Sequence, residues 1–460
     1  MNSLGVLNCL AVAEPSKYEA VQLWMSVPFV LLLALIAVMP LTGKKLKHLW
    51  ERFYPVVAIG LGLVVSAYYI GLVPGGAGDV GHSLKEYISF IALVGSLFVI
   101  SGGIEIKLAG NATPKTNTVF LLVGALLANF IGTTGASMVL IRPWMQMNRE
   151  RLSAFHIVFF IFIVSNVGGA LTPIGDPPLY IGYLRGVEFF WIFEQANLPW
   201  LFVVGALLAV FFLIDLRNFR KAGPQIAVAE KTSKSMTFSL RGIKNIGYLL
   251  VVVGAVLLPG QVPVHVREVL ETYFVREIVM LLAAVASYFQ TPSEIHAENH
   301  FNFEPIREVG YLFIGIFLTM VPALAYLTTH GPQIAETLTT PAHYYYASGA
   351  LSGFLDNTPT YANFFDLIRS IVPEDVPADK QVSWMTNPEN SGYNLLVVAI
   401  SLGSVFFGAL TYIGNGPNFM VKSIAETEKV KMPTFFGYVF RFSLPVLVPV
   451  LVLCGWIFLS

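Results

Sequence analysis

Long apolar stretches alternate with short polar links along the whole chain of 460 residues. Many of these stretches approach the ~20 residues that an α-helix needs to cross the hydrocarbon core of a bilayer. Two regions, 116–190 and 342–425, are also apolar but are interrupted by glycine, proline and polar residues. The pattern predicts uninterrupted crossing helices at 24–41, 53–73, 86–106, 197–215, 244–259, 269–289, 307–328 and 435–459.

Composition supports a membrane protein built from helices. Of all residues, 55% are apolar and only 12% are charged, whereas soluble domains carry about 25% charged residues. Lipid offers no partner to an unpaired backbone group, and the apolar runs are too long and unbroken for alternating barrel strands. The expected fold class is therefore an all-α polytopic membrane protein.

Charge and cysteine content exclude some classes of partner. The net charge is zero, so there is no electrostatic reason to expect binding to nucleic acid. Cys9 and Cys454 stand at opposite ends of the chain, so neither a structural disulfide nor a cysteine-based metal site is expected. Residues 1–13 are either a cleaved signal peptide or a polar tail, and the lack of a preceding Lys or Arg favours the tail.

The distribution of lysine and arginine predicts the orientation in the membrane. The basic segment 44–52 follows the first helix, which places the N-terminus outside. Lys115 and Arg149 both reach the cytoplasm only if 116–150 enters and leaves on the same face, as a re-entrant hairpin. The same count makes 216–243 a cytoplasmic linker and places the C-terminus outside.

Two pairs of segments indicate an internal duplication. Residues 169–175 (GALTPIG) and 408–414 (GALTYIG) agree at six of seven positions. Upstream, 124–134 and 349–359 match more weakly, in an alignment that places Thr133 opposite Thr358. Two ordered matches at nearly the same offset favour duplication over chance.

The duplication divides the chain into two repeats. The first, 1–215, contains a hairpin at 116–150 and a broken helix at 153–186; the second, 244–460, contains a hairpin at 342–370 and a broken helix at 392–425. The predicted topology gives the repeats opposite orientations, which is typical of secondary transporters whose interrupted segments mark the binding site. Simple packing kinks are the alternative. A kink, however, needs only one proline; it needs neither Thr, Asp and Asn beside that proline nor the same arrangement in both repeats.

Two aspartates are the strongest candidates for binding a coupling cation. Asp176 follows the first helix break and Asp356 lies at the tip of the second hairpin. A charged carboxylate at mid-membrane costs about 2.5–3.5 kcal/mol on insertion scales, so it usually faces a cavity and has a role. Burial favours the protonated carboxyl and a bound cation favours the ionised one, so both aspartates could exchange protons for sodium. Alternatively, either caps a half-helix, as Asp356 before Asn357 suggests.

Hydroxyl and amide side chains surround both interruptions. Their oxygens suit a hard, weakly held cation such as sodium, although Ser and Thr also join helices. No cofactor is expected beyond the coupling sodium ion or proton. His156 is expected near the membrane interface. The predicted ion- or substrate-binding residues are Asn129, Thr133, Thr134, Ser137, Thr172, Asp176, Asp356, Asn357, Thr358, Thr360, Thr411, Asn415 and Asn418.

Four motifs resemble the ion-transporter superfamily, above all its bacterial D-type sodium/proton antiporters and related citrate transporters. They are NFIGTTGASMVLIRP (129–143), SNVGGALTPIGDPPL (165–179), GFLDNTPTYANF (353–364) and GALTYIGNGPNFMVKSIAE (408–426). The resemblance implies a bacterial inner-membrane protein that forms a homodimer through a scaffold domain. It also implies a transport domain that holds both hairpins and moves like an elevator.

The hairpin tips depart from one branch of that superfamily. Its dicarboxylate carriers have Ser-Asn-Thr at both tips, whereas this chain has Gly-Thr-Thr at 132–134 and Asn-Thr-Pro at 357–359. No Lys or Arg falls in the motif cores, and Arg142 is the nearest to the first. These departures favour a cation exchanger over a carboxylate carrier.

Sodium/proton antiport is the leading hypothesis from the sequence, and transport of citrate or another organic anion with a cation is the second. A membrane-embedded enzyme is a third, but Pro173-Ile174-Gly175 before Asp176 does not match the Gly-x-Gly-Asp signature of intramembrane aspartyl proteases. No Gly-x-Ser-x-Gly motif or phosphate-binding loop is present. An ion gradient is the expected energy source. The expected substrate is a small inorganic cation or an organic anion.

Overall fold

The structure, a computed structural model, describes residues 21–39, 42–109, 112–221, 237–258, 262, 266, 269, 270 and 272–460. The N-terminal segment 1–13 and residues 222–236 of the predicted linker lie outside these residues. Of the rest of that linker, 216–221 continue a helix and 237–241 form a strand. The helix predicted at 197–215 is therefore longer at both ends, at Trp191–Lys221.

Seven helical segments in the described part of the chain are long and apolar enough to cross a membrane. Many of their large apolar side chains are exposed, as in a protein surrounded by lipid. The prediction of a helical polytopic membrane protein is thereby confirmed. The segments are α2 (Lys44–Leu72), α3 (Gly76–Gly102), α4 (Pro114–Met147), α7 (Trp191–Lys221), α13 (Glu304–Ala335), the run of η5 (Pro388–Asn390), α17 (Ser391–Phe407) and η6 (Gly408–Leu410), and the run of α19 (Phe435–Tyr438), η7 (Val439–Leu447) and α20 (Val448–Phe458).

Shorter helices lie at the start of the described chain, in the two interrupted regions and between these regions. They are η1 (Leu23–Ser26), α1 (Val27–Val38), α5 (Ala154–Ile163), η3 (Val167–Gly169), α6 (Pro177–Leu184), α9 (Lys244–Leu257), α11 (Val275–Gln290), α12 (Ser293–Glu298), α14 (Pro341–Ser352), α15 (Asn357–Ser370), α16 (Gln381–Met385) and α18 (Gly416–Thr427).

The all-α prediction missed one small sheet. β1 (Glu105–Ala109) and β2 (Thr237–Arg241) pair antiparallel, with Glu105 opposite Arg241. Arg241 also bonds Glu105 at 3.1 Å and Glu294 of α12 at 3.2 Å. Each strand is only five residues long, and the first overlaps the end of the helix predicted at 86–106, which in the structure ends at Gly102.

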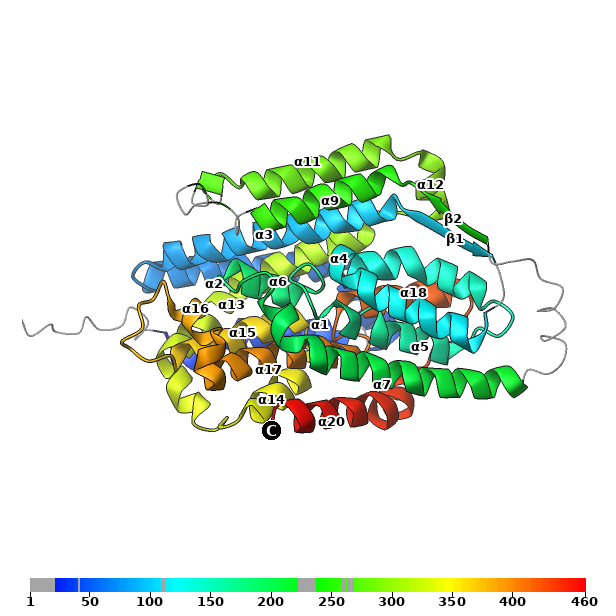
Figure 1. Ribbon diagram of the computed structural model, residues 1–460. Coiled ribbons are helices and arrows are strands. Elements are labelled where there is room, and N and C mark those ends of the chain that lie inside the picture. Colours follow the sequence, from blue (N-terminus) through cyan, green and yellow to red (C-terminus); the bar gives the residue numbers. More distant parts are fainter. Residues whose placement is uncertain are drawn as a thin grey trace, which may run out of the picture.

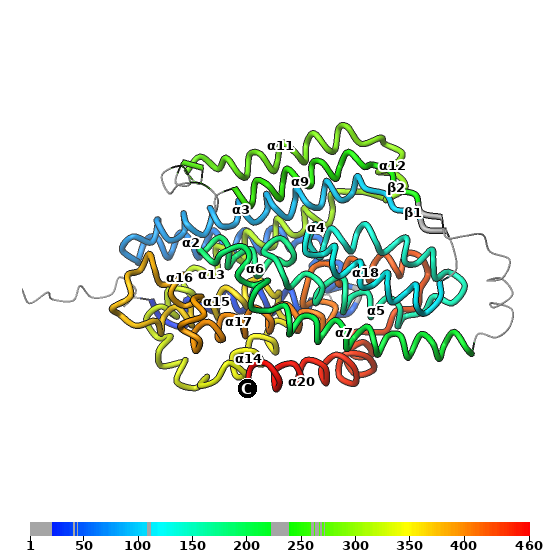
Figure 2. Tube along the Cα trace, viewed as in Figure 1, coloured from blue at the N-terminus to red at the C-terminus, as the bar shows by residue number. Residues whose placement is uncertain are grey.

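By their contacts the helices form two bundles, whose elements are labelled in Figure 1. The first bundle contains α1, α2, α3, α9, α11 and α13, and α3, α9 and α11 form one outer layer of the molecule (Figure 2). The second bundle contains both interrupted regions and α7. Helix α3 contacts α4 and α6, and α13 contacts α15, so these two long helices of the first bundle line the boundary.

Helix α4 folds back on itself at Gly132. The backbone of Gly132 has φ 74° and ψ 155°, a region that is essentially restricted to glycine. Asn117 Nδ2 donates to Asn148 Oδ1 at 2.8 Å, whereas an unbroken helix would place these residues about 46 Å apart. Residues 114–131 and 133–147 are therefore two antiparallel legs, which we call hairpin 1.

Helices α14 and α15 form a second hairpin, hairpin 2, with its tip at 353–356. Tyr344 of α14 and Phe364 of α15 approach to 6.3 Å between ring centroids. Both hairpins begin alike, because Thr113 and Thr340 each cap a helix that opens with proline. This shared start fits the predicted duplication.

The two hairpins open at opposite ends of the molecule, as α7 shows. The open end of hairpin 1, opposite its tip at Gly132, bonds to Asp215 near the end of α7. There Asn117 Nδ2 donates to Asp215 Oδ2 at 2.9 Å. The open end of hairpin 2, opposite its tip at 353–356, lies near the start of α7. There Tyr393 donates to the carbonyl of Ile371, and Trp191 donates to Asn394 Oδ1. The 24 residues between Trp191 and Asp215 span about 36 Å of helix.

Candidate functional site

The two helix breaks have the same local geometry. Asp176 and Asn415 occupy the N-cap positions of α6 and α18, with φ/ψ of −144°/143° and −152°/141°. Each break follows a short 3₁₀ turn, η3 or η6. The two peptide segments therefore present a side chain at the same point of each break, a carboxylate in one repeat and an amide in the other.

The matching GALTPIG and GALTYIG sequences are explained by contacts with the hairpins. Thr172 Oγ1 donates to the carbonyl of Asn129 in hairpin 1 at 2.6 Å, and Thr411 Oγ1 donates to the carbonyl of Gly353 in hairpin 2 at 2.6 Å. Each hydroxyl also accepts from the amide three residues later. The two threonines thus tie each break to the tip region of its own hairpin.

The last glycine of each motif is required by close backbone contact. A Cβ on Gly175 would lie 2.1 Å from the carbonyl oxygen of Gly169, and a Cβ on Gly414 would lie 2.6 Å from that of Gly408. No side chain fits at such distances without movement of the backbone. The same compact loop is therefore built twice.

Asp176 lies at the centre of a polar cluster that joins both repeats. It is 1% exposed. Its Oδ1 accepts from Thr133 Oγ1 at 2.7 Å and from Asn415 Nδ2 at 3.1 Å, and its Oδ2 accepts from Asn357 Nδ2 at 2.5 Å. The donors come from hairpin 1, the second helix break and hairpin 2. Within the described part of the chain, no Lys, Arg or His forms an ion pair with this carboxylate.

Asn166 extends the cluster and was not among the predicted residues. Its Nδ2 donates to Asn418 Oδ1 at 2.7 Å, and its Oδ1 accepts from Asn415 Nδ2 at 3.2 Å. Asn418 in turn donates to the carbonyls of Gly408 and Thr411. We call the set Thr133, Asn166, Asp176, Asn357, Asn415 and Asn418 the polar centre.

Other predicted residues of the first repeat lie beside the polar centre with structural partners. Asn129 donates to the carbonyls of Ala125 and Gly168 and accepts from the amide of Leu171. Ser137 bonds Ser165 at 2.7 Å. These contacts join hairpin 1 to the first break, so both residues hold the backbone that carries Thr133 and Asp176.

Asp356 occupies a different position from Asp176. It is the N-cap of α15, and its Oδ1 accepts from the amide of Thr358 at 3.0 Å, while Thr360 donates to its carbonyl. Asp356 and Asp176 still interact electrostatically. Asn357 links them, because it follows Asp356 in the sequence and donates a hydrogen bond to Asp176. The two carboxylates share no donor, and among described residues no group of three or more His, Cys, Asp or Glu could hold a metal ion.

Crevices lie between each hairpin tip and the first bundle. Thr134 lines the first together with Thr133, Gly175 and Tyr180, opposite Leu97 of α3. Thr358 and Pro359 line the second, opposite Phe317 and Met320 of α13. Arg142 is not among the lining residues; its Nε and Nη1 are buried and find no acceptor in the described part of the chain.

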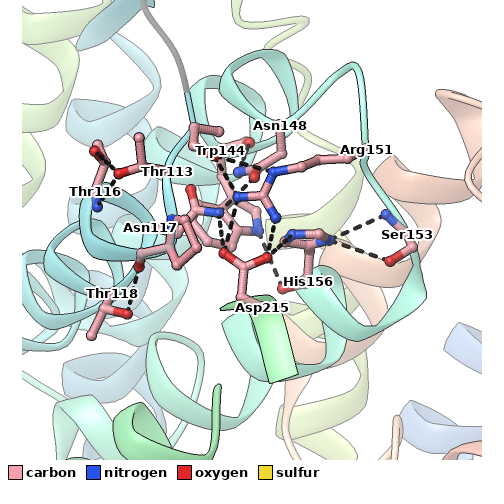
Figure 3. A network of polar contacts seen from close by, with 12 residues as sticks. Thr113, Thr116, Asn117, Thr118, Trp144, Asn148, Arg151, Ser153, His156 and Asp215 are labelled. Carbon is pink, nitrogen blue, oxygen red and sulfur yellow. Dashed lines mark hydrogen bonds and ion pairs between the residues drawn. The ribbon is translucent and has the colours of Figure 1, made fainter. Parts of the chain in front are cut away.

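A second buried network lies at the open end of hairpin 1 (Figure 3). Asp215 accepts from both terminal nitrogens of Arg151 and from Asn117, and it contacts His156 Nε2 at 3.2 Å. His156, expected near the membrane interface, is 0% exposed, so its side chain faces Asp215 inside the protein. Its partner Asp215 ends an apolar run 59 residues later, so spacing along the chain gave no sign of the pair.

Comparison with known proteins shows to which family the chain belongs. No curated protein matches the chain. A family model with the description "Putative citrate transport" matches residues 18–459. That match includes both hairpins, both helix breaks and the whole polar centre. The chain therefore belongs to this family of membrane transporters.

Proposed function

We propose that the protein is a secondary active transporter that carries citrate or a related organic anion together with a coupling cation. The observation that carries the proposal is Asp176, a buried carboxylate held only by neutral donors from both repeats. An unpaired carboxylate inside a membrane protein is a site where a proton or sodium ion can bind. The family to which the chain belongs supports citrate as the class of anion.

Charge at Asp176 explains how the cation and the anion are coupled. An anionic substrate at the tip of hairpin 1 lies close to Asp176, because Thr133 both lines the crevice and bonds that carboxylate. Two like charges about 6 Å apart repel by about 3 kcal/mol at an effective dielectric constant of about 20. A cation bound to Asp176 removes this repulsion, which favours anion binding by roughly 100-fold.

The two bundles support an elevator-like mechanism. The second bundle contains both hairpins and moves against α3 and α13 of the first. Hairpin 1 enters and leaves the bilayer on one face and hairpin 2 on the other, since they open at opposite ends of α7. The end that carries the basic residues Lys107, Lys115 and Arg149 is cytoplasmic, and the protein acts as a homodimer in a bacterial cell membrane.

Transport by purified protein in liposomes tests this function. We expect uptake of radiolabelled citrate that requires an inward gradient of sodium or protons. Asp176→Asn keeps the shape but removes the charge, so it should abolish the dependence on the gradient. Asp375→Asn, in an exposed loop, is the matched control and should behave like the wild type. Citrate uptake that never depends on a gradient would contradict the proposal.

Sodium/proton exchange is the second candidate, because Asp176 has the neutral surroundings that a cation-exchanging carboxylate needs. A pH-sensitive dye inside the same liposomes distinguishes the two functions. A sodium pulse that moves protons without citrate supports exchange. Proton or sodium movement that occurs only with citrate supports coupled anion transport.

A further inference from the structure

Tyr180 carries a buried hydroxyl that the polar centre does not use. The residue lies on α6, four positions after Asp176, and is 1% exposed. Its hydroxyl has no hydrogen-bond partner in the described part of the chain. Burial of a hydroxyl without a partner is unfavourable. The Tyr180 hydroxyl therefore lowers the stability of the folded protein.

Tyr180 lines the crevice between hairpin 1 and the first bundle. The opposite wall is apolar and belongs to α3, with Leu93, Val94 and Leu97. The near wall contains the tip of hairpin 1 at 131–135 and the first break at 173–175. Tyr180 therefore lies at the boundary between the two bundles.

The near wall of this crevice favours an anion. The second leg of hairpin 1, 133–147, begins there, and the first amides of a helix have no partner within it. The amide of Thr133 is taken by the carbonyl of Gly175 at 2.8 Å, but Thr134 and Gly135 follow at the helix start. A helix N-terminus of this length attracts negative charge.

Of the charged groups near the crevice, ionised Asp176 opposes an anion until the coupling cation binds to it, whereas the charges of the first bundle do not. Arg276 and Glu277 of α11 both interact electrostatically with Tyr180. They pair with each other, because Arg276 Nε donates to Glu277 Oε1 at 2.9 Å, so together they add little net charge. The residues that line the crevice thus include the start of a helix, Thr134 and Tyr180, all of which carry groups that can donate hydrogen bonds.

We propose that the Tyr180 hydroxyl donates a hydrogen bond to a carboxylate oxygen of the transported anion, bound at the start of the second leg of hairpin 1. The inference rests on the proposed function and assigns a specificity-determining residue to it. Tyr180 aligns with Phe419 in the second repeat, so the ring is common to both repeats and the hydroxyl is present in one.

Tyr180→Phe removes this hydroxyl and keeps the ring. In liposomes we expect the KM for citrate to rise about 10-fold, while the concentration of coupling cation that gives half-maximal uptake stays unchanged. Thermal stability of the purified variant should stay equal or rise, because the change removes a buried group without a partner. This combination distinguishes a binding role from a structural one.

Tyr344→Phe is the matched control. Tyr344 of α14 is also 1% exposed and its hydroxyl also lacks a partner among described residues, but it does not line the crevice. Its KM should match that of the wild type. An unchanged KM in Tyr180→Phe, or an equal rise in both variants, would overturn the role of Tyr180 alone. A wild-type protein without citrate uptake would overturn the proposed function and this inference with it.

Discussion

Asn166 and Asp176 both join the first helix break to the second, and Asn166 makes two of these contacts. Its amide nitrogen donates to Asn418 and its oxygen accepts from Asn415, both in the second repeat. It also donates to the carbonyl of Ile161 in its own repeat. The amide of Asn166 donates twice and accepts once, whereas a hydroxyl has a single donor and an ionised carboxylate has none, so neither can replace it here.

Asn166→Ala should lower the free energy of unfolding by about 1–3 kcal/mol, because Asn415 and Asn418 each lose a partner in a buried position. Thermal unfolding of the detergent-purified protein measures this loss. Asn197→Ala is the control, since the amide of Asn197 bonds only to carbonyls of its own helix near the surface. A variant of Asn166 as stable as the control would contradict the bridging role.

Residues at the helix breaks could be predicted, and those inside apolar runs could not. Asp176 and Asn415 stand beside glycine and proline in a membrane segment, where a polar side chain signals an interrupted helix. Asn166 comes two residues after the apolar run FIFIV (160–164), and Tyr180 lies inside the apolar and aromatic run LYIGYL (179–184). Their importance depends on which face of a short helix is buried, and a single sequence does not contain that information.

At the scale of elements, hairpin 1 depends on the backbone conformation of one residue. Gly132→Ala should destabilise the hairpin, because φ 74° with ψ 155° is unfavourable for a residue with a Cβ by about 1–3 kcal/mol. The change should lower transport together with thermal stability. Gly205→Ala in α7 is the control, since a Cβ there meets no atom within 4 Å. A Gly132→Ala variant that is as active and stable as this control would show that the tip tolerates a side chain.

The open end of hairpin 1 is held by the buried pair of Arg151 and Asp215 (Figure 3). Asp215→Asn leaves the guanidinium buried without its charged partner, which should cost about 3–5 kcal/mol of stability. Glu426→Gln removes one partner of an exposed pair with Lys422 and should change stability by less than about 1 kcal/mol. Thermal unfolding of both variants compares the two pairs.

A double variant separates the contribution of the pair from the loss of either residue. Arg151→Gln combined with Asp215→Asn should recover part of the stability that Asp215→Asn loses, because no unpaired charge remains. Equal losses in the single and the double variant would assign the effect to Asn117 and His156, the other partners of Asp215.

At the scale of the whole molecule, the ion pair of Arg185 with Glu86 crosses the boundary between the two bundles. Arg185 at the end of α6 bonds Glu86 of α3 at 3.0 Å and Asp366 of α15 at 3.0 Å. Glu86 belongs to the first bundle, whereas Arg185 and Asp366 belong to the second. If the second bundle slides, the bond to Glu86 breaks and the bond to Asp366 is kept.

The division into two bundles was implied only by the resemblance to a known superfamily. Apolar length and the repeated motifs predicted where helices begin and break, but both repeats contribute helices to both bundles. Which helices pack together depends on contacts such as that of Gly135 with Ser101, which are 34 residues apart and gave no shared pattern. Tertiary packing of this kind cannot be read from the period of hydrophobic residues.

A cross-link between the bundles tests whether they move against each other. A Cβ on Gly135 of hairpin 1 would lie 3.4 Å from the Cβ of Ser101 of α3, close to the ~3.5–4.5 Å found in disulfides. With Cys9 and Cys454 replaced by alanine, oxidation of a Ser101→Cys and Gly135→Cys pair should stop transport, and a reductant should restore it. The control pair, Gly62→Cys with Leu318→Cys, lies within the first bundle at 3.1 Å between Cβ positions and should transport normally when oxidised. Full transport by the first pair after complete oxidation would exclude sliding at this boundary and, with it, the elevator-like mechanism.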